Sequence, residues 1–85
     1  MTTDAFQAIA DANRRYLLEE LRRHPRTVNE LAAGLPISRP AVSQHLKALL
    51  ESNLVTVSSQ GTRRIYAINT AGFMHLNLWI DQFWD

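Results

Sequence analysis

Residues 27–55 read TVNELAAGLPISRPAVSQHLKALLESNLV and predict two helices joined by a short turn. Thr27 and Glu30 have the spacing of a capping box, in which each side chain accepts a hydrogen bond from the other residue's backbone N–H group. Gly34 is suited to end the first helix, and Ser38 is suited to cap the second. The stretch therefore predicts a short helix, a tight turn and a longer helix in immediate succession.

The second predicted helix, Ser38 to Ser52, has two faces of different chemistry. Its apolar residues recur at the spacing of a helix that is buried on one side. They are Val42, Leu46, Leu49 and Leu50. The opposite face carries Arg39, Pro40, Ser43, Gln44 and Lys47. This helix is therefore expected to offer one face to the core and a polar, basic face to a partner.

A β-hairpin is predicted after this helix. Residues 54–57 and residues 63–68 have the composition and alternation of strands, and Gln60-Gly61 is expected to form the turn between them. Arg63 and Arg64 would then lie just past the tip of the hairpin. Two positive charges are thus expected where the hairpin projects furthest from the core.

Further helices are predicted on both sides of this unit. Residues 4–10 form a short helix, and Asp11 is suited to cap a longer one that ends near Arg23. Thr70 is suited to cap a last helix that runs to about Trp84. Some of its large apolar side chains can close the core. Their number exceeds what one face of so small a domain can cover, so a partner surface is expected.

Length and composition set further bounds. With 85 residues, the chain is expected to form a single domain spanning 1–85. Its hydrophobic content of 46% and charged content of 20% are typical of a globular protein. The formal net charge is only +1, yet residues 39–64 hold four basic residues and one acidic residue. This basic middle section favours a partner that carries phosphate.

Several classes of function are disfavoured by what the chain lacks. It has no cysteine, no apolar run of the ~20 residues that span a bilayer, and no export signal at its N-terminus. We therefore expect a cytoplasmic protein without membrane contact. Ser43 and His45 are two positions apart on one helix and cannot face each other, and no glycine-rich phosphate loop is present. We expect that the protein is not an enzyme.

The elements occur in the order of a winged helix-turn-helix. Two short helices, the second with a basic face, are followed by a hairpin that carries arginines. The major groove of DNA, about 12 Å wide, admits one helix, and a hairpin beside it reaches the flanking backbone. The predicted fold class is therefore mainly α with a small β-hairpin, in the order α-α-α-α-β-β-α.

At this point the chain resembles the ArsR/SmtB family of bacterial transcriptional repressors. The stretch ISRPAVSQHLKALLESNLV is a specific match to that family's helix-turn-helix, and DANRRYLLEEL and GTRRIYAIN match its early helix and its wing. The resemblance covers almost the whole chain. One departure is Ala12-Asn13, where the family usually has a proline after the aspartate.

The resemblance implies a sequence-specific regulator of double-stranded DNA, a homodimeric repressor on a pseudo-palindromic operator. Helix Ser38–Ser52 would enter the major groove, and the Ser58–Arg64 wing would lie on the flanking backbone. Gln44 suits adenine, and Arg39 suits guanine or phosphate. For His45, a base contact and a structural hydrogen bond both stay open. The implied DNA-binding residues are Ser38, Arg39, Pro40, Ser43, Gln44, His45, Lys47, Arg63 and Arg64.

In the family that the chain resembles, the first and last helices form a two-fold dimer interface. The residues that would supply it here are Phe6, Ile9, Phe73, Leu76, Trp79, Ile80 and Phe83. Metal-sensing members use cysteine pairs or closely spaced His and carboxylate ligands, whereas His75 and Asp81 lie six residues apart. We therefore expect the metal-independent branch, without metal or other cofactor, and with an effector or partner protein that the sequence does not identify. A purely protein-binding module and RNA binding are the weaker alternatives.

Overall fold

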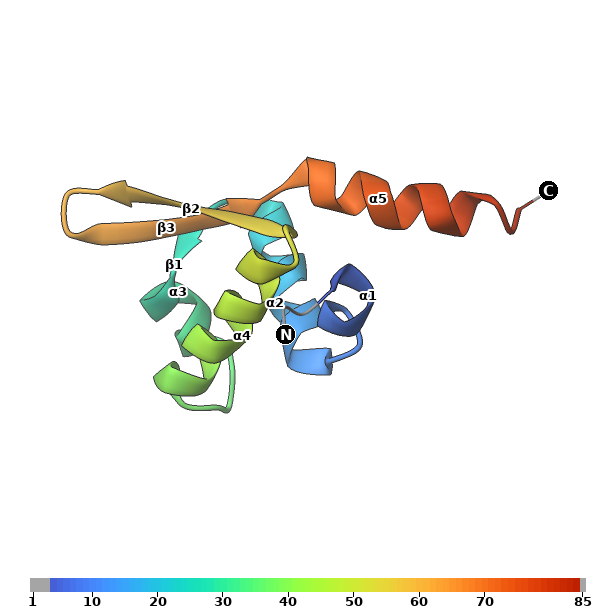
Figure 1. Cartoon of the computed structure of the whole chain (residues 1–85). Coiled ribbons are helices and arrows are strands. Elements are labelled where there is room, and N and C mark those ends of the chain that lie inside the picture. The colour runs from blue at the N-terminus through green and yellow to red at the C-terminus, as the bar shows by residue number, and fades with distance from the viewer. Residues whose placement is uncertain (1–3, 85) are drawn as a thin grey trace.

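The computed structural model describes residues 4–84 and has a helical body with a small sheet along one side (Figure 1). In chain order the elements are α1 (Ala5–Ala8), α2 (Ala12–Arg23), β1 (Arg26–Thr27), α3 (Val28–Ala33), α4 (Arg39–Glu51), β2 (Val55–Gln60), β3 (Arg63–Ile68) and α5 (Thr70–Asp81). The order of helices and hairpin is the expected one, with β1 added. The fold class, mainly α with a small hairpin, is confirmed.

The side chains expected to cap α2, α3 and α4 do so. Oγ of Ser38 and the carboxylate of Asp11 each accept a bond from the third backbone N–H of their helix, at 3.2 Å and 3.1 Å. At the start of α3, Oγ1 of Thr27 accepts from the Glu30 N–H at 3.3 Å, and Oε1 of Glu30 accepts from the Thr27 N–H at 2.9 Å. These bonds satisfy N–H groups that have no partner within the helix.

Two boundaries of the last helix differ from expectation. The N-cap of α5 is Asn69 and not Thr70, because Oδ1 of Asn69 accepts the backbone N–H of Ala71 at 3.2 Å. An asparagine one position earlier offers the same acceptor chemistry as the threonine, so the sequence alone did not distinguish them. The helix also ends at Asp81, short of Trp84.

The hairpin is longer than predicted, and its turn falls one residue later. Gln60 pairs with Arg63, so Gly61-Thr62 forms the turn. Gly61 has a φ of 64°, a left-handed conformation that a residue without Cβ adopts most easily. The sequence analysis missed β1, which pairs with β3 and gives the sheet order β1-β3-β2. A strand of two residues is too short to show an alternating pattern.

One apolar cluster fills the space between helices and sheet. The predicted inner face of α4 contributes Val42, Leu46 and Leu49, each with no exposed surface. Leu50, expected on the same face, is half-buried and lies at its edge. The largest fully buried side chains are Leu17, Leu31, Leu46, Leu49, Leu54 and Val42. Because this core anchors α4 along its inner side, the direction in which its outer face points is fixed relative to the body.

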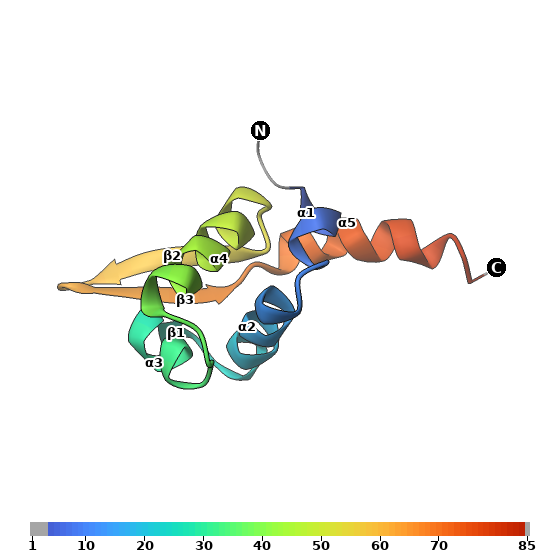
Figure 2. The same ribbon diagram turned by 90° about the horizontal axis from the view of Figure 1, so that it is seen from below.

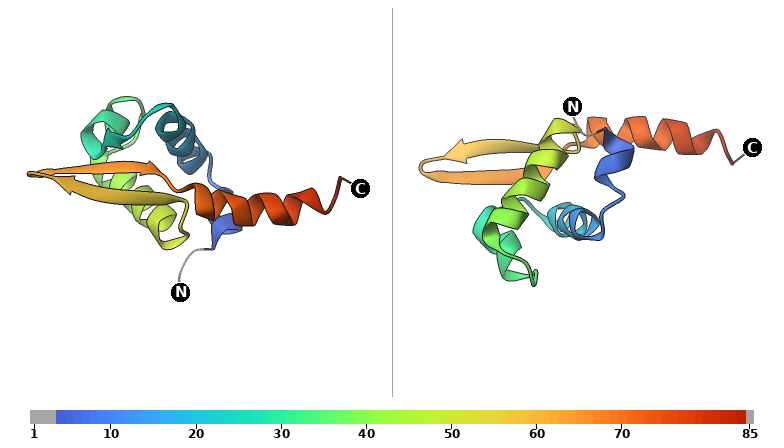
Figure 3. Two further views of the ribbon diagram at one scale, coloured as in Figure 1. Left: turned by 90° about the horizontal axis from the view of Figure 1, so that it is seen from above. Right: turned by 60° about the horizontal axis from the view of Figure 1, so that its bottom comes forward.

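The hairpin and α5 extend from this body in opposite directions (Figures 1 to 3). Of α5, only Gly72 and Leu76 are buried. A Cβ at Gly72 would lie 1.9 Å from the carbonyl oxygen of Asn53, so the helix packs directly on backbone there. The rest of α5 projects beyond the body, which makes the molecule 46 × 28 × 25 Å.

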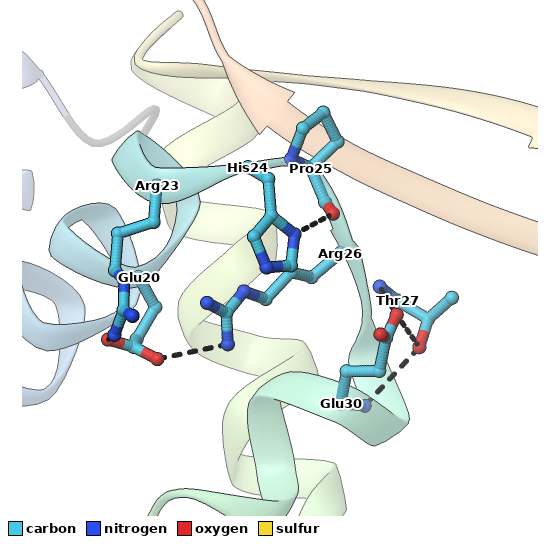
Figure 4. Close-up of polar contacts among 7 residues, drawn as sticks. All are labelled: Glu20, Arg23, His24, Pro25, Arg26, Thr27 and Glu30. Atoms are coloured by element: carbon cyan, nitrogen blue, oxygen red, sulfur yellow. Dashed lines mark hydrogen bonds and ion pairs between the residues drawn. The ribbon is translucent and has the colours of Figure 1, made fainter.

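Polar contacts fix the junction between α2, β1 and α3 (Figure 4). Nη1 of Arg26 lies 3.0 Å from Oε1 of Glu20, and Nη1 of Arg23 lies 3.8 Å from the other carboxylate oxygen. The Arg26 side chain is only 15% exposed, so water screens its ion pair less than it screens a surface pair. The pair ties β1 to α2, and this sets the direction in which the next residues enter α3.

Candidate nucleic-acid interface

The outer face of α4 is exposed along its length. Each polar residue assigned to this face from the sequence lies at the surface, while the inner face is buried. The exposed residues are Ser38, Arg39, Pro40, Ser43, Gln44 and Lys47. Because Ser38 caps the helix and Pro40 lies in its first turn, the N-terminal end of α4 is well defined and presents its side chains to solvent.

The structure brings the basic residues of α4 and of the hairpin together. An open hollow between α4 and β3 is lined by Arg39, Ser43, Lys47 and Arg64, with Val28, Leu50 and Tyr66 as its apolar floor. A neighbouring hollow adds Arg63 and Thr62 from the hairpin tip, Thr27 from β1 and Asn29 from α3. Arg39 and Arg64 line both hollows. Residues 25 positions apart in the chain thus form one basic, concave surface.

The sequence analysis missed the contribution of α3 to this surface. Glu30 lies beside the hairpin, where its Oε1 is 3.8 Å from Nη2 of Arg63. The backbone N–H of Thr27 donates to the same carboxylate and holds its pKa below the ordinary value, so it is charged at neutral pH. Asn29 lines the hollow one position earlier. The strand β1 pairs with β3 and leads directly into α3, which places α3 beside the hairpin. A strand of two residues has no alternating pattern by which the sequence could reveal it.

His45 lies away from these hollows and contacts α2. Its ring is half-buried, and Nδ1 lies 3.4 Å from Nη1 of Arg14. Arg14 also donates from Nε to the carbonyl of Ala8 at 2.7 Å and from Nη2 to that of Gln7 at 3.1 Å. The structure therefore gives His45 a structural partner, an arginine rather than the backbone carbonyl considered from the sequence. Arg14 itself was not identified as a structural residue.

A second surface is apolar and lies on α1 and α5. The ring of Trp79 packs edge-on against Phe6 at 5.1 Å between centroids and lies 4.7 Å from the ring of Phe83. All three rings remain about half exposed or more, and Ile80 is 38% exposed. Leu76, by contrast, is 5% exposed and belongs to the core, so it has little surface to offer a partner. Ile9 and Phe73 are partly buried against that core.

Large apolar side chains absent from the expected interface are also exposed on this part of the chain. They are Met74, Leu78 and Trp84.

No helix within residues 4–84 is both long and apolar enough to cross a bilayer. The same part of the chain holds no cluster of three or more His, Cys, Asp or Glu residues that could bind a metal ion.

A basic hollow between the second helix of a helix-turn-helix and an arginine-bearing hairpin is suited to the sugar-phosphate backbone and the major groove. Residues 11–57 match the family model for bacterial regulatory proteins of the ArsR family. This chain belongs to the ArsR family. The matched range begins at the N-cap of α2 and ends within β2, so it covers the whole helix-turn-helix.

Individual relatives of the chain agree with this assignment. The HTH-type transcriptional regulator Rv2034 of Mycobacterium tuberculosis is 49% identical over 80 residues, covering 94% of this chain and 75% of the relative. A crystal structure of a possible transcriptional regulator for arsenical resistance has a TM-score of 0.85 at 40% identity, covering 93% of this chain and 82% of that one. A homodimeric winged helix-turn-helix DNA-binding domain from Mycobacterium bovis, solved by NMR, has a TM-score of 0.72 at 25% identity, covering 93% and 77%.

The ArsR-family chain is accordingly a transcriptional regulator with a winged helix-turn-helix DNA-binding domain. Its relatives are named as regulators, which is a non-enzymatic role.

Proposed function

We propose that this ArsR-family protein is a homodimeric repressor that binds a pseudo-palindromic operator. The helix Ser38–Ser52 enters the major groove, and the wing, residues 58–64, lies on the flanking backbone. The observation that carries the proposal is the shared hollow in which Arg39, Ser43 and Lys47 of α4 meet Arg64 of β3. A duplex seated on α4 brings backbone phosphates to that hollow.

The residues of this surface divide by the chemistry they offer. Gln44 projects from the exposed face of α4 and can make two hydrogen bonds with an adenine edge. Ser43 suits either a base or a phosphate. Arg39 lines both hollows beside Arg64, which favours a phosphate over a guanine as its partner. Lys47 lies a turn further from the helix N-terminus and is placed for the backbone. Ser38 and Pro40 define the helix end that enters the groove.

The homodimer is supported by the exposed aromatic surface on α1 and α5. Trp79 packs against both Phe6 and Phe83, yet each of the three residues keeps 45% or more of its surface exposed. So large an apolar area on a small domain is typical of a protein interface. A related ArsR-type domain is homodimeric. A two-fold dimer would hold two α4 helices about 34 Å apart, which matches successive major grooves on one side of DNA.

Repression follows from this mode of binding. A dimer seated on two successive major grooves excludes other proteins from that stretch of DNA, so an operator that overlaps a promoter is blocked. We place the protein in the metal-independent branch because the chain has no cysteine and its last helix offers only His75 and Asp81, six residues apart. We further propose that it acts in the cytoplasm, and that an effector or partner protein releases the DNA.

Selection of bound duplexes from a random library with the purified protein tests the proposal. We expect a motif with two-fold symmetry. We also expect the binding constant to fall steeply as salt rises, with a slope of about −0.9 per contacted phosphate in a plot of log binding constant against log salt concentration. A slope near zero would show that the winged helix serves protein contacts instead. Enrichment of an asymmetric motif would contradict the symmetric dimer.

A further inference from the structure

The two arginines of the wing have different surroundings. Nη2 of Arg63 lies 3.8 Å from Oε1 of Glu30 on α3. Arg64 has no carboxylate within 4.0 Å among the described residues, and it lines the hollow with Arg39 and Lys47. Adjacent residues of the same charge are therefore not equivalent, since one has a carboxylate beside it in the free protein and the other does not.

The carboxylate of Glu30 is fixed by its own helix. Its Oε1 accepts the backbone N–H of Thr27 at 2.9 Å, which is one of the two bonds of the α3 capping box, and it also accepts the Thr27 hydroxyl at 3.0 Å. The negative charge therefore stays next to Arg63, which lines the hollow together with Thr27 and Arg39. The Arg63 side chain is 63% exposed and that of Glu30 is 50% exposed, so both groups are accessible to an incoming phosphate.

We propose that Glu30 competes with DNA phosphate for Arg63 and so lowers the sequence-independent affinity of the protein for duplex DNA. The charge of Glu30 partly neutralises the Arg63 guanidinium and repels an approaching phosphate, so Arg63 attracts DNA less than an arginine without a carboxylate beside it. When a phosphate binds Arg63, the DNA releases a cation from that phosphate. Glu30 then attracts a cation from solution, because Arg63 no longer neutralises it fully, and the two effects offset each other. Arg63 therefore adds little to the salt dependence of binding, whereas Arg64 contributes in full.

This inference rests on the proposed DNA-binding function, and a random-sequence duplex titrated across salt concentrations tests it. Glu30→Gln keeps the capping box, because glutamine serves at that position, and removes only the charge. We expect its affinity to rise roughly threefold to tenfold at low salt and its log–log slope to steepen by about 0.9 per protomer. Arg63→Ala is expected to weaken wild-type binding less than Arg64→Ala does, and to abolish the gain in the Glu30→Gln background.

Glu19→Gln is the matched control. It makes the same change in net charge on the exposed surface of α2, away from both hollows, and should leave affinity and slope unchanged. Arg63→Ala leaves Glu30 and its cap intact, so it gives a measure that does not depend on how well Glu30→Gln folds. The inference is overturned if Arg63→Ala weakens wild-type binding as much as Arg64→Ala, or if Glu30→Gln matches the wild type. Failure of the wild type to bind any duplex would instead remove the proposed function itself.

Discussion

Nη1 of Arg14 on α2 lies 3.4 Å from Nδ1 of His45 on α4. The same guanidinium donates to the carbonyls of Gln7 and Ala8 at the end of α1. One side chain therefore connects the helix that carries Phe6, part of the apolar surface, to the helix that carries the DNA-facing residues. The Arg14 side chain thus contacts both α1 and α4 from its position on α2.

Replacing Arg14 with alanine should lower the free energy of unfolding by about 2 kcal/mol, because carbonyls at the end of α1 and the His45 ring lose a charged donor. Urea denaturation followed by circular dichroism measures this. Arg22→Ala, on the exposed side of the same helix, is the control and should change stability by less than about 0.5 kcal/mol. Equal losses in the two variants would mean that the Arg14 bonds contribute nothing beyond helix propensity.

Asp11 makes the stability of α2 depend on pH. The backbone N–H of Arg14 donates to this carboxylate and lowers its pKa from the ordinary 3.8. Because the pKa is lower in the folded state than in the unfolded state, the carboxylate stabilises the fold fully above the ordinary value. That stabilisation is lost as the pH falls through the lowered pKa that Asp11 has in the folded state. Asp11→Ala should be less stable than wild type by about 1 kcal/mol at neutral pH. The gap should narrow in acid, and a gap independent of pH would contradict this.

Gly72→Ala should destabilise the protein by about 1–3 kcal/mol, although alanine favours helices. The new methyl group would lie 1.9 Å from the carbonyl oxygen of Asn53, so α5 has to move away from the core. Thermal unfolding measures the loss, and Met74→Ala, at an exposed position of α5, provides the comparison. An unchanged melting temperature for Gly72→Ala would show that α5 can shift without cost.

Gln44→Ala should weaken binding to the selected operator by about 1–3 kcal/mol and relax the preference at one base pair. Arg64→Ala should weaken binding to operator and random duplex alike, because phosphate contacts carry no sequence information. Competition titrations with both duplexes separate the two effects. If Gln44→Ala loses as much affinity on random duplex as on the operator, Gln44 does not read a base.

Trp79→Glu should convert the dimer to monomers, because it places a charge at the centre of the aromatic surface formed with Phe6 and Phe83. Operator affinity should fall about 100-fold as the second half-site contact is lost. Sedimentation equilibrium measures the mass. Leu78→Glu, on another side of the same helix, tests whether the aromatic side alone forms the interface. A dimer that survives Trp79→Glu would place the interface elsewhere.

Local sequence patterns predicted the helix-turn-helix well. The caps at Asp11, Thr27 and Ser38 and the buried side of α4 all involve residues within a few positions of one another. Hydrogen bonds and periodic burial at this range depend on the spacing of residue types and hardly on the rest of the fold. The exposed basic face of α4 followed from the same pattern, since what is not buried on a two-faced helix is exposed.

Contacts between distant residues were decided only in three dimensions. The two-residue strand β1, the Arg14–His45 contact, the Glu30–Arg63 pair and the burial of Leu76 each depend on how separate elements pack. The sequence by itself therefore determined the helices, the hairpin and which face of α4 is polar. The tertiary structure decided that an acidic residue of α3 lies beside the wing and that one arginine joins three helices. Packing has to bring those charges within a few ångströms before they interact at all.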